Sequence, residues 1–224
     1  MGAVLHAAVI HLTPEGLLVQ ALDTHQSTLV HAAMGSPVTI GGHFCAHVPS
    51  VRQAVRSVPA RVMVDIEVDR DAFTLKWGRQ THRFPHLALP LKSPPVDFEP
   101  CATFIGKDAS ELLKFCRDTR ASTVVFVAER SQPLTIRAKG DLYESTLTLE
   151  RCRRVITFND KLISAGPDAC EVRCTTRNVL AASKAWQFAK SVIVCVGRGE
   201  VLLQYRATQG VVSFLIASAA GVPA

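Results

Sequence analysis

Basic side chains recur at helical spacing along this sequence of 224 residues. In the segment 108–120, Lys114 and Arg117 are three residues apart, and Arg120 follows after three more. Residues three or four apart share one face of an α-helix, so these side chains would form a basic stripe. Such a stripe can bind the phosphates of duplex DNA through salt-sensitive contacts that do not depend on base sequence. A basic stripe on one helix is compatible with DNA contact and with an ordinary solvated surface.

Two further segments carry basic residues at comparable spacing. Residues 174–186 include two basic side chains that are two helical turns apart, and residues 49–58 include a basic pair four residues apart. An ordinary solvated helix face has the same pattern, so the pattern alone does not choose between the two interpretations. Only in combination with a family resemblance does this recurrence favour DNA contact, and it does so for Lys114, Arg117 and Lys184, while both interpretations stay open for Arg52, Arg56, Arg120 and Arg177.

Two groups of potential metal ligands alternate with other residues in extended segments. Carboxylates between apolar residues could bind Mg²⁺ in a nuclease, but strict alternation is typical of the solvent-facing side of a half-buried strand. Three soft ligands on one face could begin a zinc site, but no fourth ligand is nearby. We therefore expect no metal site in either group. The carboxylates are Asp65, Glu67, Asp69 and Asp71, and the soft ligands are His43, Cys45 and His47.

The seven cysteines and the sequence motifs give no support to catalysis. The number of cysteines is odd and none form a CxxC pair, which indicates reduced and mostly buried thiols. Cys116 stands beside Arg117, yet no histidine or asparagine completes a nucleophile pattern there. The sequence contains no P-loop, GxGxxG, GxSxG or HExxH motif. We expect a protein that is not an enzyme and needs no cofactor.

Composition and charge narrow the class of protein further. Hydrophobic residues make up 48% of the chain and charged residues 20%, which excludes a disordered protein. The longest apolar run is too short and too polar to span a bilayer, and no secretion or lipidation signal is recognisable, so we expect an intracellular protein. The net charge of +6 arises entirely in residues 151–224, which carry 10 Lys and Arg against 4 Asp and Glu. A basic C-terminal half favours a polyanionic partner.

The elements that position these residues are mostly strands. Apolar and acidic side chains alternate over Val62–Asp69, which is the period of a strand with one buried face. Helices are expected only over 49–58, 108–120, where Asp108 is the expected N-cap, and 174–186. The expected strands are 4–12, 16–22, 27–34, 62–69, 71–77, 101–106, 122–129, 133–139, 142–150, 153–159, 191–197, 200–207 and 210–217.

A proline-rich segment divides the chain into two similar halves. Residues 87–100 contain Pro90, Pro94 and Pro95, which break strand pairing and predict an interdomain connector. An N-terminal domain over 1–86 and a C-terminal domain over 101–224 follow from it. Each half has a helix followed by paired strands, so the halves are interpreted as one fold used twice. The first half lacks the opening strand and helix that residues 101–120 supply in the second.

The order of several segments resembles a known family. These segments are Gly16–Asp23 followed by Ser27–Val30, the helix Glu111–Asp118, and Gly199–Tyr205 with Val211–Ala217. In their order and spacing around the connector, they resemble the sliding DNA clamps of the proliferating cell nuclear antigen (PCNA) family over essentially the whole chain. The resemblance implies an α+β clamp fold of two similar domains, with antiparallel sheets outside and short helices lining an inner face.

The resemblance also implies a function and partners. Such clamps are processivity factors that encircle double-stranded DNA, usually as a homotrimer, after a clamp loader has placed them there. They recruit DNA polymerase and other proteins of DNA replication and DNA repair in the nucleus. Their clamp-binding peptides dock in a pocket, although core packing is an equally open role for Leu22 and Leu29. The matching pocket positions are Leu22, Gln26, Leu29, Leu89, Leu91, Val96, Leu215, Ile216 and Ala217.

Ring closure in this family implies pairing between the edge strands of neighbouring subunits. We expect residues near 76–84 of one subunit, or its connector side, to meet residues 142–150 together with 122–129 of the next. The chain departs from the family in its short first half, its basic charge, Gln26 in place of histidine, and Glu200 and Ser218 in place of prolines. Two alternatives stay open: a subunit of a heterotrimeric DNA-damage checkpoint clamp, and a monomeric basic DNA-binding accessory protein.

Overall fold

The protein is of the α+β class, with antiparallel sheets and three short α-helices. The structure, a computed structural model, describes residues 5–22, 28–38, 41–60, 62–88, 98–140, 143–152, 157–158, 161–162 and 167–219. Within these residues no helix is long and apolar enough to cross a membrane.

The first half contains a four-strand unit, one helix and a separate three-stranded sheet. The four strands lie in the order β4-β1-β2-β3 and the three in the order β5-β6-β7. Helix α1 follows β4 directly. The elements are β1 (Ala7–Thr13), β2 (Gly16–Leu22), β3 (Thr28–Met34), β4 (Gly42–His47), α1 (Val48–Val55), β5 (Asp65–Val68), β6 (Ala72–Trp77) and β7 (Gln80–Pro85).

The second half begins with a strand and a helix and then repeats this arrangement. Its elements are β8 (Pro100–Gly106), α2 (Glu111–Asp118), β9 (Thr123–Glu129), β10 (Leu134–Lys139), β11 (Glu144–Arg151), β12 (Thr157–Phe158), β13 (Lys161–Leu162), β14 (Ala169–Thr175), α3 (Thr176–Ser183), the 3₁₀ helix η1 (Lys184–Phe188), β15 (Val192–Gly197), β16 (Glu200–Ala207) and β17 (Gly210–Ala217). Strands β12 and β13 form a small hairpin apart from the main sheet.

The two halves share one topology. The order β14-β9-β10-β11 matches β4-β1-β2-β3, and β15-β16-β17 matches β5-β6-β7. Helix α3 follows β14 as α1 follows β4. In the second half β8 lies between β11 and β15 and joins the two groups of strands. The described part of the first half has no counterpart of β8 or α2, so its two groups of strands stay separate.

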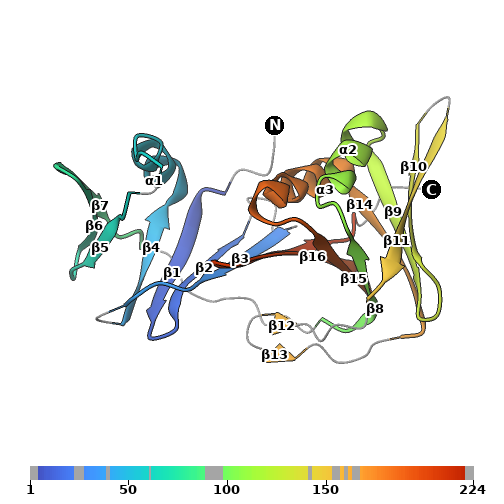
Figure 1. Ribbon diagram of the computed structural model, residues 1–224, viewed down its shortest axis with the longest axis horizontal. Helices are drawn as coiled ribbons and strands as arrows, with labels where there is room; N and C mark the ends of the chain where they lie inside the picture. The colour runs from blue at the N-terminus through green and yellow to red at the C-terminus, as the bar shows by residue number, and fades with distance from the viewer. Residues whose placement is uncertain are drawn as a thin grey trace.

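A single ladder joins the halves. Strand β17 pairs with β3 over seven residue pairs, so the main sheet runs through 12 strands from β14 to β4. At this join Gly210 has φ +156°, and a Cβ there would collide with the carbonyl oxygen of Ala33. All three helices lie on one side of the main sheet, with α2 and α3 next to each other and α1 near the opposite end (Figure 1).

The largest core lies between the second half of the sheet and its two helices. Leu112 and Cys116 of α2 and Val179 of α3 pack there against strand residues such as Phe126 and Leu203, which are fully buried. A smaller core around Phe44, Phe73 and Trp77 holds α1 and the three-stranded sheet together. Burial of these apolar groups is the main force that fixes the helices on the sheet.

Candidate nucleic-acid interface

Helix α2 carries the basic pair predicted from the sequence. It begins at Glu111 rather than at 108, and the Asp108 carboxylate precedes it and accepts hydrogen bonds from the Ser110 N–H and hydroxyl, both at 2.8 Å. These bonds favour the ionised form and lower the pKa of Asp108, with a smaller contribution from Lys114. A carboxylate at this position also suits the positive end of the helix dipole. The N-cap residue is Ser110 rather than the expected Asp108, whose carboxylate instead binds Ser110 just before the helix.

The two faces of α2 differ in the way the sequence predicts. Leu112, Leu113 and Cys116 are buried against the sheet, whereas Lys114 and Arg117 are exposed. The Lys114 ammonium lies 3.5 Å from an Asp108 carboxylate oxygen, and its side chain is 65% exposed. Exposed ion pairs of this kind are weak, so Lys114 remains free to exchange this partner for a phosphate.

Arg120 does not continue the stripe, which corrects the expectation of a helix over 108–120. Helix α2 ends at Asp118, and Arg120 has φ 51°, a left-handed conformation that terminates the helix. The Tyr143 hydroxyl donates hydrogen bonds to the carbonyl oxygens of Asp118, at 3.1 Å, and Thr119. The last turn is thereby closed, and Arg120 is exposed beyond it.

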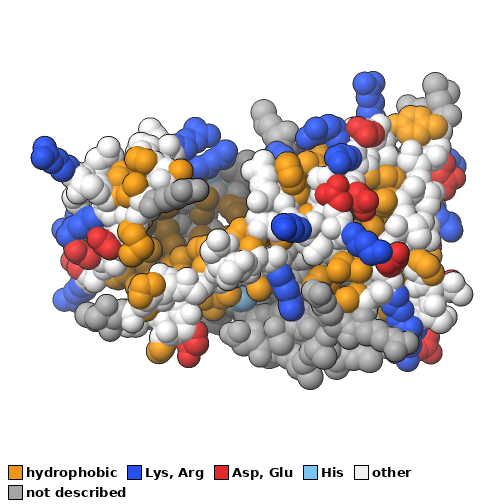
Figure 2. All heavy atoms as spheres, viewed as in Figure 1, with side chains coloured by type: hydrophobic (Ala, Val, Ile, Leu, Met, Phe, Trp, Pro, Cys, Tyr) orange, Lys and Arg blue, Asp and Glu red, His pale blue; other side chains and the backbone are white. Residues whose placement is uncertain are grey.

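Helix α3 places two more predicted residues on the same side of the sheet. It is shorter than the expected 174–186, because Cys174 belongs to β14 and the α-helix gives way to η1 at Lys184. Arg177 and Lys184 are both exposed, while Val179 is fully buried. Helices α2 and α3 contact each other, so their basic residues belong to one surface. Figure 2 shows Lys and Arg side chains gathered over the helices.

Helix α1 contributes the third basic pair at the far end of the sheet. Arg52 and Arg56 are exposed, whereas Ala54 faces the sheet and is buried. Arg56 is the C-cap residue, and basic side chains near the end of a helix complement its dipole. The structure thus brings the predicted basic residues to one side of the main sheet in two groups, one on α1 and one on α2 and α3 (Figure 2).

Three residues beside α2 and η1 were missed by the sequence prediction. Lys107, Trp186 and Lys190 line a shallow hollow of about 510 Å³, and the Trp186 ring is 38% exposed. Lys107 is ion-paired with Glu150 at 2.9 Å, again with both side chains largely exposed. Aromatic and basic groups together are common in nucleic-acid surfaces. Asp108 also lines the hollow. The sequence prediction missed Lys107 and Lys190 because they lie outside the expected helices 108–120 and 174–186, and the exposure of Trp186 is not visible in the sequence.

The predicted peptide pocket is only partly described. Leu22 lies opposite Leu29, and Leu29 lies opposite Leu215, so the three form one row across β2, β3 and β17. Leu29 and Leu215 pack with Phe98 on the sheet face away from the helices. Ile216 points to the helix side instead and is fully buried in the main core. Ala217 is half-buried, and Gln26, Leu89, Leu91 and Val96 lie outside the described residues.

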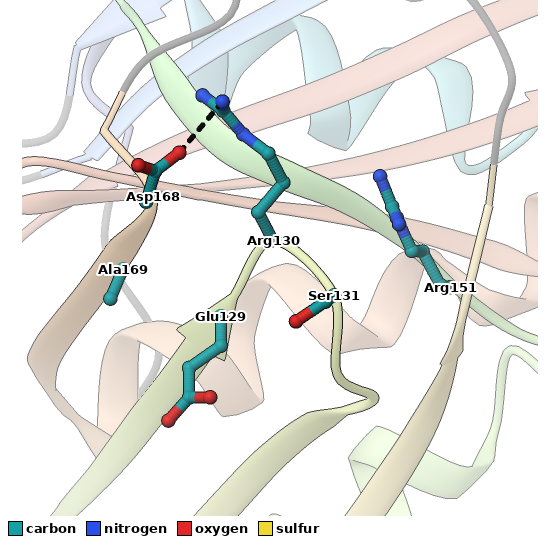
Figure 3. Close-up of a pocket in the computed structure, with 6 residues that line it drawn as sticks. All are labelled: Glu129, Arg130, Ser131, Arg151, Asp168 and Ala169. Atoms are coloured by element: carbon teal, nitrogen blue, oxygen red, sulfur yellow. Dashed lines mark ion pairs between the residues drawn. The ribbon is translucent and has the colours of Figure 1, made fainter.

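A second hollow of about 570 Å³ lies where β9, β11 and β14 end. The Arg130 guanidinium binds the Asp168 carboxylate at 2.7 Å, and Arg151 stands across from this pair on β11 (Figure 3). Glu129 and Ser131 complete the polar lining, and the hollow carries equal numbers of basic and acidic groups. The residues that line it include no histidine or cysteine beside Ser131, so the lining presents no activated nucleophile.

The potential metal ligands have other partners in the structure. Glu67 is ion-paired with Lys76 at 2.6 Å, and Asp69 with Arg83 at 3.0 Å. The Asp69 carboxylate also accepts two backbone N–H bonds, which lower its pKa. No group of three histidine, cysteine or acidic residues in the described part of the chain stands close enough to hold a metal ion.

The candidate zinc ligands of β4 differ in their exposure to solvent. On β4, Cys45 is buried and burial raises its pKa, while His43 and His47 are exposed. His43 lies directly opposite His11, with 6.0 Å between ring centroids, and burial together with the His43 charge lowers the pKa of His11. All seven cysteines are free and five are buried, which confirms the prediction of mostly buried thiols.

Two of the open strand edges among the described residues bear on the expected contact between subunits. Strand β7 pairs only with β6, and β11 pairs with β8 only through Glu150 and Arg151, which leaves 144–149 unpaired on that side. The expected edge at 122–129 is wrong, because β9 is enclosed by β14 and β10. Strands β4, β5 and β14 also lie at sheet edges.

Comparison with known proteins finds no matching family model and no matching curated protein.

Proposed function

We propose that this chain is a subunit of a ring-shaped sliding clamp that holds DNA polymerase and other replication or repair proteins on duplex DNA. The observation that carries the proposal is the internal duplication, because it predicts how one copy would join the next. Strand β17 pairs with β3 inside the chain, and by topology β7 corresponds to β17 and β11 to β3. The duplication therefore favours pairing of β7 with β11 of another copy.

Both strands of this predicted pair have an open edge. Alignment of the halves on their shared topology places Thr81 at the position of Val211 and Thr148 at that of Ala33, which are partners in the β17–β3 ladder. Thr81 and Thr148 are both exposed. A head-to-tail contact of this kind closes into a ring when the rotation from one copy to the next is a whole fraction of a full turn. Closure would also protect the edges from unwanted pairing.

The charges of the helix side support DNA as the occupant of such a ring. Lys114, Arg117, Arg177 and Lys184 are exposed on α2, α3 and η1, and Arg52 and Arg56 are exposed on α1. Long basic side chains on a fixed scaffold can exchange phosphate partners, and such contacts position a protein on DNA without stopping it at one sequence. A clamp needs this property because it must slide.

The mass of the purified chain in solution tests the proposal. A self-assembling clamp predicts a species of three times the chain mass of 24.3 kDa by light scattering at micromolar concentration. A species that stays monomeric and still binds linear DNA would support the monomeric accessory protein instead. A monomer that assembles only with two unlike subunits would support the heterotrimeric checkpoint clamp.

A further inference from the structure

The helix side of β1, β2 and β3 is an apolar surface that no described helix covers. One row across the sheet consists of Val212, Ala32, Val19 and Ile10, which are direct cross-strand partners. The neighbouring rows continue it on both sides with apolar residues only. The residues of this surface, called here the apolar saddle, are Ala8, Ile10, Leu12, Leu17, Val19, Ala21, Val30, Ala32, Met34, Val212 and Phe214.

The apolar saddle lies between α1 and α3. Helix α1 packs on β4 through Ala54 and Phe44, and α3 contacts β17. Nine of the 11 residues of the saddle are only partly buried. At its edges Ile10 and Leu12 pack against the core below α1 and Phe214 against the core below α3, whereas Val19, Ala32 and Met34 in the middle belong to none of the core clusters. Figure 2 shows hydrophobic side chains deep in the space between the part that carries α1 and the part that carries α3. A contiguous apolar surface of this kind marks a docking site.

The width of the saddle fits a single helix. Four strand intervals separate β4 from β17 in the order β17-β3-β2-β1-β4. At about 4.8 Å per interval they span about 19 Å. Packed helices lie 8–10 Å apart between axes, so one helix fits between α1 and α3 at normal distance from each. The topology agrees, because α2 is the element of the second half that has no described counterpart in the first.

The rim of the saddle is basic and therefore favours a helix with an acidic polar face. Arg52 and Arg56 are exposed on or directly after α1 at one side of the saddle, and Arg177 and Lys184 are exposed on α3 and η1 at the other. The segments Val48–Val55 and Thr176–Phe188, which form the rim, contain no Asp or Glu. A basic rim around an apolar floor is complementary to an amphipathic helix with an acidic polar face.

We infer that the apolar saddle binds one amphipathic helix with acidic flanks, supplied by a partner protein, between α1 and α3. Its apolar face would cover Val19 and Ala32, and its carboxylates would meet the arginines of α1 and the basic residues of α3 and η1. These are the same cations that the proposed clamp offers to phosphates. The helix would therefore compete with DNA, and its binding would regulate the occupancy of the inner face. The inference stands independently of ring formation.

A designed peptide tests this inference. The probe is a labelled 15-residue helix with leucines on one face and glutamates elsewhere, and its binding is followed by fluorescence anisotropy. A length of about 15 residues matches the length of the strands below it. One control peptide has the same composition in scrambled order, and a second has lysine in place of glutamate. We expect the probe to bind at least about tenfold more tightly than either control.

Two substitutions on adjacent residues give a matched pair. Ala32 faces the saddle and Ala33 faces the opposite side of β3, and both are half-buried. Ala32→Gln should weaken probe binding about tenfold, because an amide side chain would be buried in the apolar contact, whereas Ala33→Gln should change it less than about twofold. Circular dichroism checks that both variants are folded. The comparison of the three peptides uses the unsubstituted chain, so it tests the inference even if a variant does not fold.

Each contrary result has a definite meaning. Equal binding of the probe and the scrambled peptide, or equal effects of the two substitutions, would overturn the inference. Equal binding of the lysine peptide would overturn the acidic character of the partner. A change of the chain's mass caused by Ala32→Gln alone would show that a second copy occupies the saddle instead. A chain that forms a ring but does not bind the probe refutes only this inference, and a monomer that binds it refutes only the proposed ring.

Discussion

Phe214 of β17 lies directly opposite Val30 of β3, so the last strand of the second half and the third strand of the first belong to one ladder. In the shared topology of the halves, the open edges of β7 and β11 correspond to the edges that pair here. Phe84 of β7 takes the position of Phe214, and Ser145 of β11 takes the position of Val30. A molecule built from two equivalent halves that join in this way can continue the same join between copies.

The first prediction concerns the contact between copies. The double variant Thr81→Cys/Thr148→Cys should form disulfide-linked dimers and trimers under mild oxidation, because these residues are predicted partners across the β7–β11 contact. Denaturing gels without reductant measure the products. Each single variant reports the background from the native cysteines. A second control, Thr81→Cys/Thr123→Cys, places the second thiol on the enclosed strand β9. Equal cross-linking of both double variants would refute the predicted register.

The second prediction concerns the DNA contacts of α2. Lys114→Ala/Arg117→Ala should weaken binding to duplex DNA and reduce the slope of log affinity against log salt by about two units, because two phosphate contacts are lost. The matched control is Arg137→Ala/Lys139→Ala, which removes the same charge from the side of β10 that faces away from the helices. If the two double variants behave alike, the DNA surface lies elsewhere.

The third prediction is a loss of stability in mild acid. The pKa of His11 is lowered in the folded chain, first by burial and then by His43, so the unfolded chain binds a proton more readily. Stability should be fully present above pH 6.5, the unfolded value, and should fall as the pH drops from there through the lower folded value. Urea midpoints at pH 7.5 and 5.5 measure the effect. His11→Gln should reduce the difference, and the exposed His6→Gln should leave it unchanged.

The fourth prediction concerns thiol reactivity. Burial raises the pKa of Cys116, Cys174 and Cys195 to about 12, so these thiols carry almost no thiolate at pH 8. They should react with a chromogenic disulfide reagent only when the chain unfolds, while the half-buried Cys152 and Cys170 react first. Mass spectrometry of the labelled peptides assigns each site. Early labelling of Cys195 in folded protein would contradict the core described here.

The strands of regular alternation were predictable from the sequence. Strands β2, β16 and β17 have the predicted bounds, because each is mainly apolar, β2 begins after the turn at 14–15, and the turn at 208–209 separates β16 from β17. Strand β4 was not predicted, since it begins at a glycine pair and has buried side chains at consecutive positions. Strand β14 is also absent from the expected strands, and its last two residues, Cys174 and Thr175, fall in the expected helix over 174–186, because their types suit either element and only pairing with β9 decides between them.

The candidate site was predictable only where local spacing determines it. Lys114 and Arg117 are exposed on α2 as expected, since a helix face follows from its period. Arg120 leaves that face because the helix ends at Asp118, where Tyr143, a residue distant in sequence that precedes β11, donates a hydrogen bond to the Asp118 carbonyl oxygen. Ile216 turns toward the helices because neighbouring residues of a strand face opposite sides. The apolar saddle could not be predicted, because it depends on which strands lie beside each other and on where α1 and α3 are placed.

The proposed ring is tested most directly by the topology of its link to DNA. The Thr81→Cys/Thr148→Cys variant is oxidised in the presence of relaxed circular duplex DNA and then washed at high salt, which removes electrostatic contacts. A closed ring predicts that cross-linked protein stays on the circle and is released when a single cut makes the DNA linear. Equal retention on circular and linear DNA, or complete loss from the circle despite cross-linking, would contradict the account.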